Sequence, residues 1–147
     1  MAENEGVYAI GDIHGRLDLL DKLVELVEDD AVARGLTASI VFTGDYVDRG
    51  PESFGVLERL IRGHSEAGTT FVCLRGNHDD MFAKAILSGQ WPYEWYGDLF
   101  CHTIRSYGAD ATSWRENTDL RRHARFIADL PLYHRHGHYL FVHAGIR

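Results

Sequence analysis

Four short segments of the sequence combine glycine with aspartate, asparagine or histidine. They are GDIHG (11–15), GDYVDRG (44–50), RGNHD (75–79) and HAG (143–145). Carboxylate, amide and imidazole groups all bind metal ions, and this mixture of nitrogen and oxygen donors suits Mn, Fe or Zn better than Ca²⁺. The candidate ligands are Asp12, His14, Asp45, Asn77 and His143. Together the four segments predict a metal centre.

The spacing within these segments supports that prediction. Asp12 and His14 are two residues apart, and in extended backbone this spacing places both side chains on one face. Asp45 has two carboxylate oxygens and could bridge two ions. A single Gly-Asp pair after a strand is more often a turn or a helix cap, and a lone histidine in an apolar strand is more often a core residue. Four such segments favour a site, because buried carboxylates without partners are costly.

The elements that would position these residues alternate between strand-length apolar runs and helix-length amphipathic runs. We expect strands over 7–10, 39–42 and 69–74, and helices over 17–34, 51–63, 79–87, 98–107 and 118–129. Pro51 suits the first position of its helix. The aromatic segment 88–97 is expected to be a packed connection or lid, and 132–142 a hairpin. Strands that alternate with helices predict a parallel α/β sheet, in which ligands bind beyond the carboxyl ends of the strands.

Composition limits the alternatives. The chain has 147 residues, 45% of them apolar, and is expected to form one domain over 1–147 with a buried core. The formal net charge of −7 argues against a nucleic-acid partner. The N-terminal MAENEGVYAI has no basic segment and no long apolar run, so no signal peptide or membrane span is expected. We therefore expect a cytoplasmic protein without a membrane partner.

The four motifs, taken together and in order, resemble those of the calcineurin-like metallophosphoesterases. More narrowly, they resemble the phosphoprotein phosphatases and their bacterial serine/threonine phosphatase relatives. GDYVDRG is the most specific of the four, and the resemblance runs from Val7 to the end of the sequence. It implies an α/β fold, a sandwich of two mixed β-sheets flanked by helices, with a dinuclear metal centre.

The resemblance also implies a role for each ligand. Asp12 and His14 would bind the first metal ion, Asp45 would bridge both, and Asn77 and His143 would bind the second. The cofactors would be two divalent ions, Mn²⁺ being the first expectation and Fe or Zn the alternatives. Such ions lower the pKa of a bound water towards neutrality and supply a nucleophile.

Three residues are expected to act on the substrate itself. By the same resemblance, Arg49 would bind the substrate phosphate, assisted by Asn77 and His78, because its planar guanidinium can pair with two phosphate oxygens. His78 would be the general acid, oriented by Asp48. Asp48 lies three residues beyond Asp45, which is too far to share its metal comfortably but leaves it free to hold an imidazole.

The leading expectation is a phosphomonoester hydrolase that removes phosphate from phosphoserine or phosphothreonine in proteins, with small phosphoesters as other substrates. One alternative is a dinucleoside polyphosphate hydrolase acting on diadenosine tetraphosphate, because bacterial members share these motifs. Another is an inactive scaffold fragment that binds protein partners. Comparing turnover of a phosphopeptide and of diadenosine tetraphosphate would separate the two enzymes.

The family pattern continues beyond VHAG with a further arginine and a histidine-bearing segment, which this sequence lacks. We therefore expect a C-terminally truncated chain, a weakened second metal site and low or no activity. The hairpin would expose an unpaired edge, which invites dimerisation.

Other residues carry weaker expectations. Arg75 could contact phosphate or form a structural ion pair. The aromatic side chains of 91–96 would pack or line a groove, packing being favoured. Surface or packing roles are expected for the remaining histidines of interest, His102, His123, His134, His136 and His138.

Overall fold

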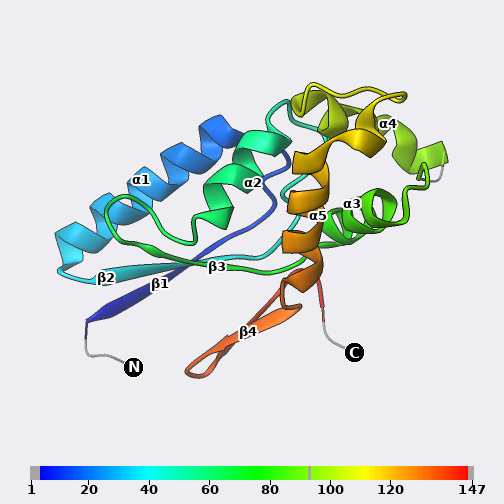
Figure 1. The fold of residues 1–147 in the computed structure, drawn as a ribbon. Coiled ribbons are helices and arrows are strands. Elements are labelled where there is room, and N and C mark those ends of the chain that lie inside the picture. The colour runs from blue at the N-terminus through cyan, green and yellow to red at the C-terminus, as the bar shows by residue number, and fades with distance from the viewer. Residues whose placement is uncertain (1–3, 93, 146–147) are drawn as a thin grey trace.

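The computed structural model describes residues 4–92 and 94–145 (Figure 1). Its elements, in chain order, are β1 (Glu5–Ile10), α1 (Leu17–Arg34), β2 (Thr37–Phe42), α2 (Ser53–Ile61), β3 (Thr70–Cys73), α3 (Asn77–Ser88), α4 (Glu94–Ser106), a 3₁₀ turn (Trp114–Glu116), α5 (Thr118–Asp129), β4 (Tyr133–His136) and β5 (Tyr139–Val142). The predicted alternation of strands and helices is confirmed. None of the described helices is both long and apolar enough to cross a bilayer.

The main sheet contains three parallel strands in the order β1-β2-β3. Its register pairs Ile10 with Phe42 and Phe42 with Cys73, which are the last residues of the three strands. The loops that follow the three strands therefore leave the sheet at the same level and side by side. This register is what brings residues 11–15, 44–50 and 75–79 to one edge, as expected for a parallel sheet.

Helices α1 and α2 lie together on one face of this sheet (Figure 1). Leu20 and Val24 of α1 are buried against the core, one helical turn apart, while Leu19, Leu23, Leu26 and Val32 of the same helix are exposed among its charged residues. Strand β2 is the best buried of the three, with Ile40 and Phe42 fully inaccessible. The core thus fixes the position of β2, the central strand, and the loop that carries residue 45 begins where this strand ends.

The hairpin β4–β5 lies on the opposite side of the main sheet from α1 and α2 (Figure 1). A cavity of about 340 Å³ separates it from the face of β1 that carries Val7 and Ala9. For this reason neither β1 nor the hairpin is well buried on this side. In β1 only Ile10 is buried, and in β5 Tyr139 and Leu140 are exposed.

Three predicted boundaries also differ. Helix α3 begins at Asn77 instead of residue 79, so two predicted site residues belong to its first turn. Pro51 precedes α2 instead of opening it. Helix α4 begins at residue 94, inside the segment expected to be a connection or lid. The helix predicted over 118–129 is confirmed at both ends.

Candidate metal centre

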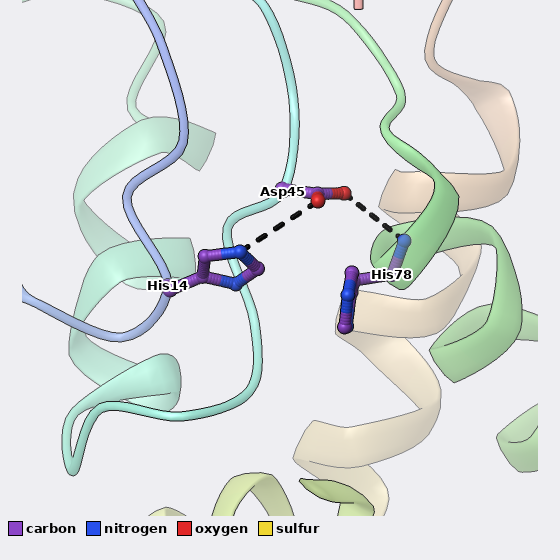
Figure 2. Close-up of side chains that lie close together, drawn as sticks. All are labelled: His14, Asp45 and His78. Carbon is purple, nitrogen blue, oxygen red and sulfur yellow. Dashed lines mark hydrogen bonds and ion pairs between the residues drawn. The ribbon is translucent and has the colours of Figure 1, made fainter. Parts of the chain in front are cut away.

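Asp45 lies at the centre of the predicted site, just beyond β2, and its side chain is almost fully buried. Its Oδ2 atom is 3.7 Å from Nε2 of His14, a contact that Figure 2 marks with a dashed line. Its Oδ1 atom is 3.5 Å from Nε2 of His143 and accepts a 3.0 Å hydrogen bond from the backbone N–H of His78. The two oxygens of one carboxylate therefore face two separate groups of donors, which is the arrangement of a bridging ligand.

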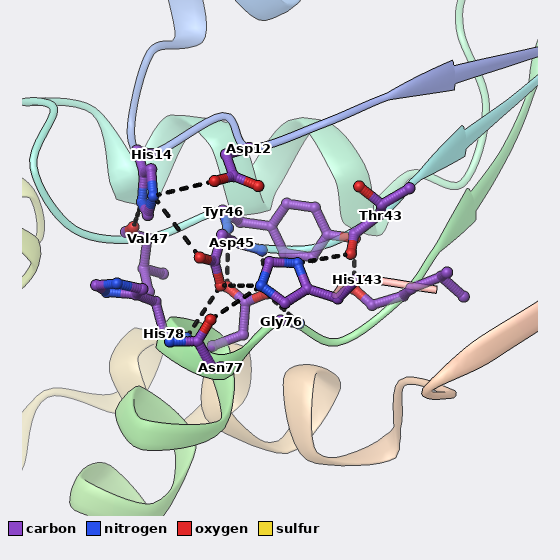
Figure 3. Close-up of polar contacts among 12 residues, drawn as sticks. Asp12, His14, Thr43, Asp45, Tyr46, Val47, Gly76, Asn77, His78 and His143 are labelled. Atoms are coloured by element: carbon purple, nitrogen blue, oxygen red, sulfur yellow. Dashed lines mark hydrogen bonds and ion pairs between the residues drawn. The ribbon is translucent and has the colours of Figure 1, made fainter. Parts of the chain in front are cut away.

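All five predicted ligands meet in this cluster (Figure 3). Ligand atoms of Asp12, Asp45 and His143 lie within 4.8 Å of one another, and so do those of His14, Asp45 and His78. Asn77 joins the first group, since its Oδ1 atom is 2.9 Å from Nε2 of His143. Segments separated by up to 131 positions in the sequence thus converge, and none of the five lies elsewhere.

The donor set fits a cation, as the hydrogen bonds of His14 demonstrate. Its Nδ1 atom is 2.7 Å from the carbonyl oxygen of Val47, a contact that only an N–H can make favourably. In the neutral imidazole Nε2 then carries a lone pair, and this atom is buried and has no hydrogen-bond partner in the described part of the chain. It faces carboxylate oxygens of Asp12 and Asp45 at 3.8 and 3.7 Å. A lone pair against two carboxylates is repulsive unless a positive ion lies between them.

His143 presents the same pattern on the other side of Asp45. Its Nδ1 atom lies 3.1 Å from the carbonyl oxygen of Thr43, and its Nε2 atom faces the amide oxygen of Asn77 and a carboxylate oxygen of Asp45. In either neutral tautomer one ring nitrogen points a lone pair at an oxygen acceptor. A metal ion at Nε2 removes that conflict, and a carbonyl partner at Nδ1 is the usual support of a metal-binding histidine.

The backbone of the ligand loops is unusual. In the described chain every non-glycine residue with positive φ lies in these loops: His14 (44°), Asp45 (58°), Asp48 (71°) and Arg49 (65°). Asp12 and His14 do face the same site, with Nε2 of His14 3.8 Å from Oδ2 of Asp12, but the backbone between them is not extended as expected, because the chain turns at His14. Left-handed backbone outside glycine is strained and concentrates at functional sites.

Glycine is required where two of these loops touch. A Cβ atom on Gly76 would lie 2.1 Å from Oδ1 of Asp45. A Cβ atom on Gly44, which has φ of 113°, would lie 2.5 Å from the backbone nitrogen of Gly76. Any side chain at either position would push the second and third ligand loops apart, and this explains the glycines that flank the ligands.

Asp79 is a supporting residue that the sequence analysis did not identify. Its fully buried carboxylate accepts hydrogen bonds from the backbone N–H groups of Asp45 (2.7 Å), Tyr46 (2.8 Å) and Gly76 (2.9 Å). It thereby ties the loop after β2 to the first turn of α3. Burial raises the pKa of its carboxyl to about 6. An acidic residue at the third position of a helix was the available signal, but it could be recognised only with the helix start at Asn77.

His78 and Asp48 form a buried pair beside the ligands. Nδ1 of His78 lies 2.8 Å from Oδ2 of Asp48, and the other carboxylate oxygen accepts a 2.6 Å hydrogen bond from the hydroxyl of Thr103. The Thr103 oxygen in turn accepts from the backbone N–H of Asp48 at 2.9 Å. Thr103 lies on α4, and nothing in its sequence context identified it. Nε2 of His78 makes no hydrogen bond to any residue that the structure describes.

The two arginines of the motifs differ. Arg49 is exposed and makes no hydrogen bond or ion pair with the described residues, so its guanidinium is available to a ligand. Arg75 is engaged: Nη1 donates to the carbonyl oxygen of Ala128 at 3.0 Å and lies 3.8 Å from Oδ1 of Asp80. These contacts match the structural ion pair expected as one role of Arg75, and not the alternative of contact with phosphate.

The other histidines lie outside the cluster. His123 is buried between helices, His134 stacks on Phe141, and His136 lies 3.8 Å from Glu5. His102 and His138 are exposed. Among the aromatic residues of 91–96, Trp91 and Tyr96 pack with Phe100, while Tyr93 and the side chain of Trp95 lie outside the described part.

Comparison with known families decides the classification. The calcineurin-like phosphoesterase family matches residues 6–147. This chain belongs to that family. Membership implies divalent metal ions, which agrees with the donor set described above. A crystal structure of a metallophosphoesterase from Sphaerobacter thermophilus has the same fold, with a TM-score of 0.53 and 19% identity, over 94% of this chain and 46% of that one.

Curated relatives correct the expected substrate. The chain is 35% identical to a symmetrical bis(5'-nucleosyl)-tetraphosphatase of Methylococcus capsulatus, over 95% of this chain and 43% of the relative. It is 33% identical to a protein of the same name from Dechloromonas aromatica, with the same coverage. The chain thus spans less than half the length of these relatives. The expectation of a protein serine/threonine phosphatase is wrong, because the motifs recognise the phosphate and not the group attached to it.

Proposed function

We propose that this chain carries the metal centre of a hydrolase of dinucleoside polyphosphates, with Mn²⁺ as the metal. The observation that carries the proposal is the position of Asp45, whose two oxygens face two groups of donors at the edge of the sheet. Similarity to the symmetrical tetraphosphatases supports nucleotides as the substrate class. The donors Asp12, His14, Asn77 and His143 would complete the binding of two ions.

Each residue then has a task in the reaction. When bound, the divalent ions would supply charge neutralisation and a water of lowered pKa. Arg49 would pair with the oxygens of the phosphoryl group under attack. Water oxygen would bond to phosphorus, the P–O bond of the anhydride would break, and His78 would give a proton to the departing phosphate oxygen. Asp48 would hold the imidazole in place through Nδ1.

Hydrolysis of competing substrates tests this function. The purified chain, loaded with Mn²⁺, would be given diadenosine tetraphosphate, a phosphoserine peptide and an aryl phosphate at equal concentration, and products would be separated by chromatography. We expect the dinucleotide to be the best substrate. Asp45→Asn should abolish turnover and His102→Gln, which alters an exposed histidine outside the cluster, should leave it unchanged. A higher kcat/KM for the phosphopeptide would contradict the proposal, and so would absence of both metal binding and turnover.

We also propose that two copies of the chain pair through the hairpin. Strands β4 and β5 pair only with each other in the described chain, so each leaves one edge unpaired. Leu132, Tyr133, Tyr139 and Leu140 are exposed there. An unpaired edge with apolar side chains favours strand addition. Size-exclusion chromatography with light scattering should give a dimer for the chain and a monomer for Leu140→Lys, whereas a monomer for both would contradict this.

A further inference from the structure

A second cavity, of about 450 Å³, lies between α3 and the segment that leads into α4. Met81 and Ala85 form its wall on α3, Lys84 lies beside Ala85, Ser88 is the last residue of that helix, and Trp91 and Tyr96 close the opposite side. Its size is within the range of small-molecule sites, and its walls are mainly apolar and aromatic. None of these residues takes part in the metal cluster.

The cavity lies further along α3 than His78, and Tyr96 is the residue of its lining that packs nearest to that histidine. Met81 and Ala85 follow His78 on α3 by three and seven residues, so they lie about 4.5 and 10 Å further along the helix axis. The ring of Tyr96 is 6.1 Å from the ring of His78. The cavity is therefore one to two helical turns from His78 along α3, a separation that a nucleotide departing from phosphorus towards His78 would be long enough to span.

Trp91 forms a firm aromatic wall of this cavity. Its ring meets Phe100 edge-on at 5.3 Å and Trp114 at 6.0 Å. Behind it, a Cβ atom on Gly97 would lie 3.1 Å from its Nε1 atom, so a larger residue there would crowd the indole. These contacts hold the ring, yet 38% of the residue stays exposed. An indole that is held in place and open on one side is suited to stacking against a planar ligand.

Lys84 adds a positive charge at the rim. Its side chain is 75% exposed, and its Nζ atom lies 2.6 Å from Oδ2 of Asp80. Because α3 carries His78 in its first turn and Lys84 almost two turns later, the ammonium group lies between the site of cleavage and the far end of the cavity. A ligand with anionic and planar aromatic parts matches this order of groups.

We propose that this cavity binds the nucleobase of the departing nucleotide, with the base stacked on Trp91 and its phosphates directed past Lys84 to His78. The assignment rests on the proposed nucleotide hydrolase function and extends it by naming where the leaving group is recognised. A peptide substrate would gain little from one planar wall at the end of a helix. The aromatic platform, in contrast, accepts any base, because every base has a flat π face.

Direct binding of ADP tests the inference independently of turnover. Titration calorimetry in the presence of Mn²⁺ would compare ADP with inorganic pyrophosphate, which has the same phosphates but no base. Trp91→Ala should weaken ADP binding roughly 5- to 150-fold, the range expected for loss of one stacked base. Pyrophosphate binding should stay unchanged. Leu87→Ala, on the exposed side of α3, is the matched control and should bind ADP as the parent chain does.

A second variant covers the case in which Trp91→Ala disturbs the aromatic cluster. Ser88 lines the cavity and is exposed, so Ser88→Trp should fold normally, fill the space and exclude the base. We expect it to weaken ADP binding at least as much as Trp91→Ala does. Unchanged ADP binding in both variants would overturn the inference, as would failure of the parent chain to bind ADP more tightly than pyrophosphate.

The same variants separate this inference from the proposed function. If the parent chain hydrolyses diadenosine tetraphosphate while both variants retain its KM and its ADP affinity, the function stands and the base site does not. If ADP binding depends on Trp91 but no dinucleotide is cleaved, the base site stands and the proposed reaction fails. A phosphopeptide that competes with ADP and loses affinity in both variants would assign the cavity to peptides instead.

Discussion

Two buried histidines, each paired with a carboxylate, occupy different regions of this molecule. His78 pairs with Asp48 at the edge of the sheet, at 2.8 Å. His123 of α5 pairs with Glu58 of α2 inside the helical layer, also at 2.8 Å. The two distances are alike and both imidazoles are buried, although the side chain of Glu58 is 36% exposed and that of Asp48 is inaccessible. Only the first pair lies among metal-type ligands.

The difference between them is the second ring nitrogen. In His123, Nδ1 lies 2.6 Å from the hydroxyl of Tyr107, so both nitrogens are occupied, and the ring packs 5.6 Å from Phe54. In His78, Nε2 has no partner in the described chain. An imidazole with both nitrogens satisfied links elements of the fold, whereas one with a free nitrogen beside a ligand cluster can exchange a proton. The ring nitrogen without a hydrogen-bond partner, and not the carboxylate on the other nitrogen, therefore distinguishes a histidine with a chemical role from a structural one.

Among changes to the two histidine pairs, replacing His78 should produce the largest effect. His78→Gln removes the proposed general acid, so hydrolysis of diadenosine tetraphosphate should fall about 10²- to 10⁴-fold in kcat. Steady-state kinetics with Mn²⁺ would measure this, and urea denaturation would verify that the variant is folded under the assay conditions. The matched control is His123→Gln, which should keep kcat within a few-fold. An equal loss of kcat in the two variants would show that the two histidines do not differ in chemical role.

Thr103 tests how strongly the functional pair depends on its support. Thr103→Val keeps the shape of the side chain but removes the hydroxyl that donates to Asp48. Loss of a hydrogen bond to a buried charge should lower the free energy of unfolding by about 1.5–3 kcal/mol. Urea denaturation measures it. Thr112→Val, on an exposed turn, is the control, and a similar loss there would show that the effect is not specific to Asp48.

The structural pair should affect stability alone. His123→Leu leaves the buried hydroxyl of Tyr107 without its partner, so the free energy of unfolding should drop by about 1–3 kcal/mol. The kcat for the dinucleotide should stay within a few-fold of the parent value. If His123→Leu lost activity towards the dinucleotide while it stayed folded, the His123–Glu58 pair would have a chemical role.

The smallest expected effect is a pH dependence of stability. Burial lowers the pKa of His123 below its usual 6.5, so at low pH the unfolded chain binds a proton that the folded chain does not. The contribution of this group is complete above pH 6.5 and is lost as the pH falls through the lower, folded pKa, with a slope of at most about 1.4 kcal/mol per pH unit. Denaturation midpoints between pH 7.5 and 5 would show it. In His123→Leu this part of the slope should vanish, and an identical slope would contradict the assignment.

Several features could be predicted from the sequence because they depend on neighbouring residues. The helix over 118–129 follows from the spacing of its apolar positions, and the ligand loops follow from donors placed beside glycine at strand ends. A parallel sheet then has to bring those ends together, since its carboxyl ends share one edge. Local composition was thus sufficient to nominate Asp12, His14, Asp45, Asn77 and His143.

Other features depend on contacts between residues far apart in the chain, and these only the tertiary structure decided. Asp79 reaches Asp45 across 34 positions, Thr103 reaches Asp48 across 55, and His123 reaches Glu58 across 65. No local pattern records such pairs, because they form only when separate helices pack against one core. The sequence therefore determined which donors meet and that they can bind a cation. Packing determined which histidine keeps a ring nitrogen without a partner, and which cavity lies near that histidine.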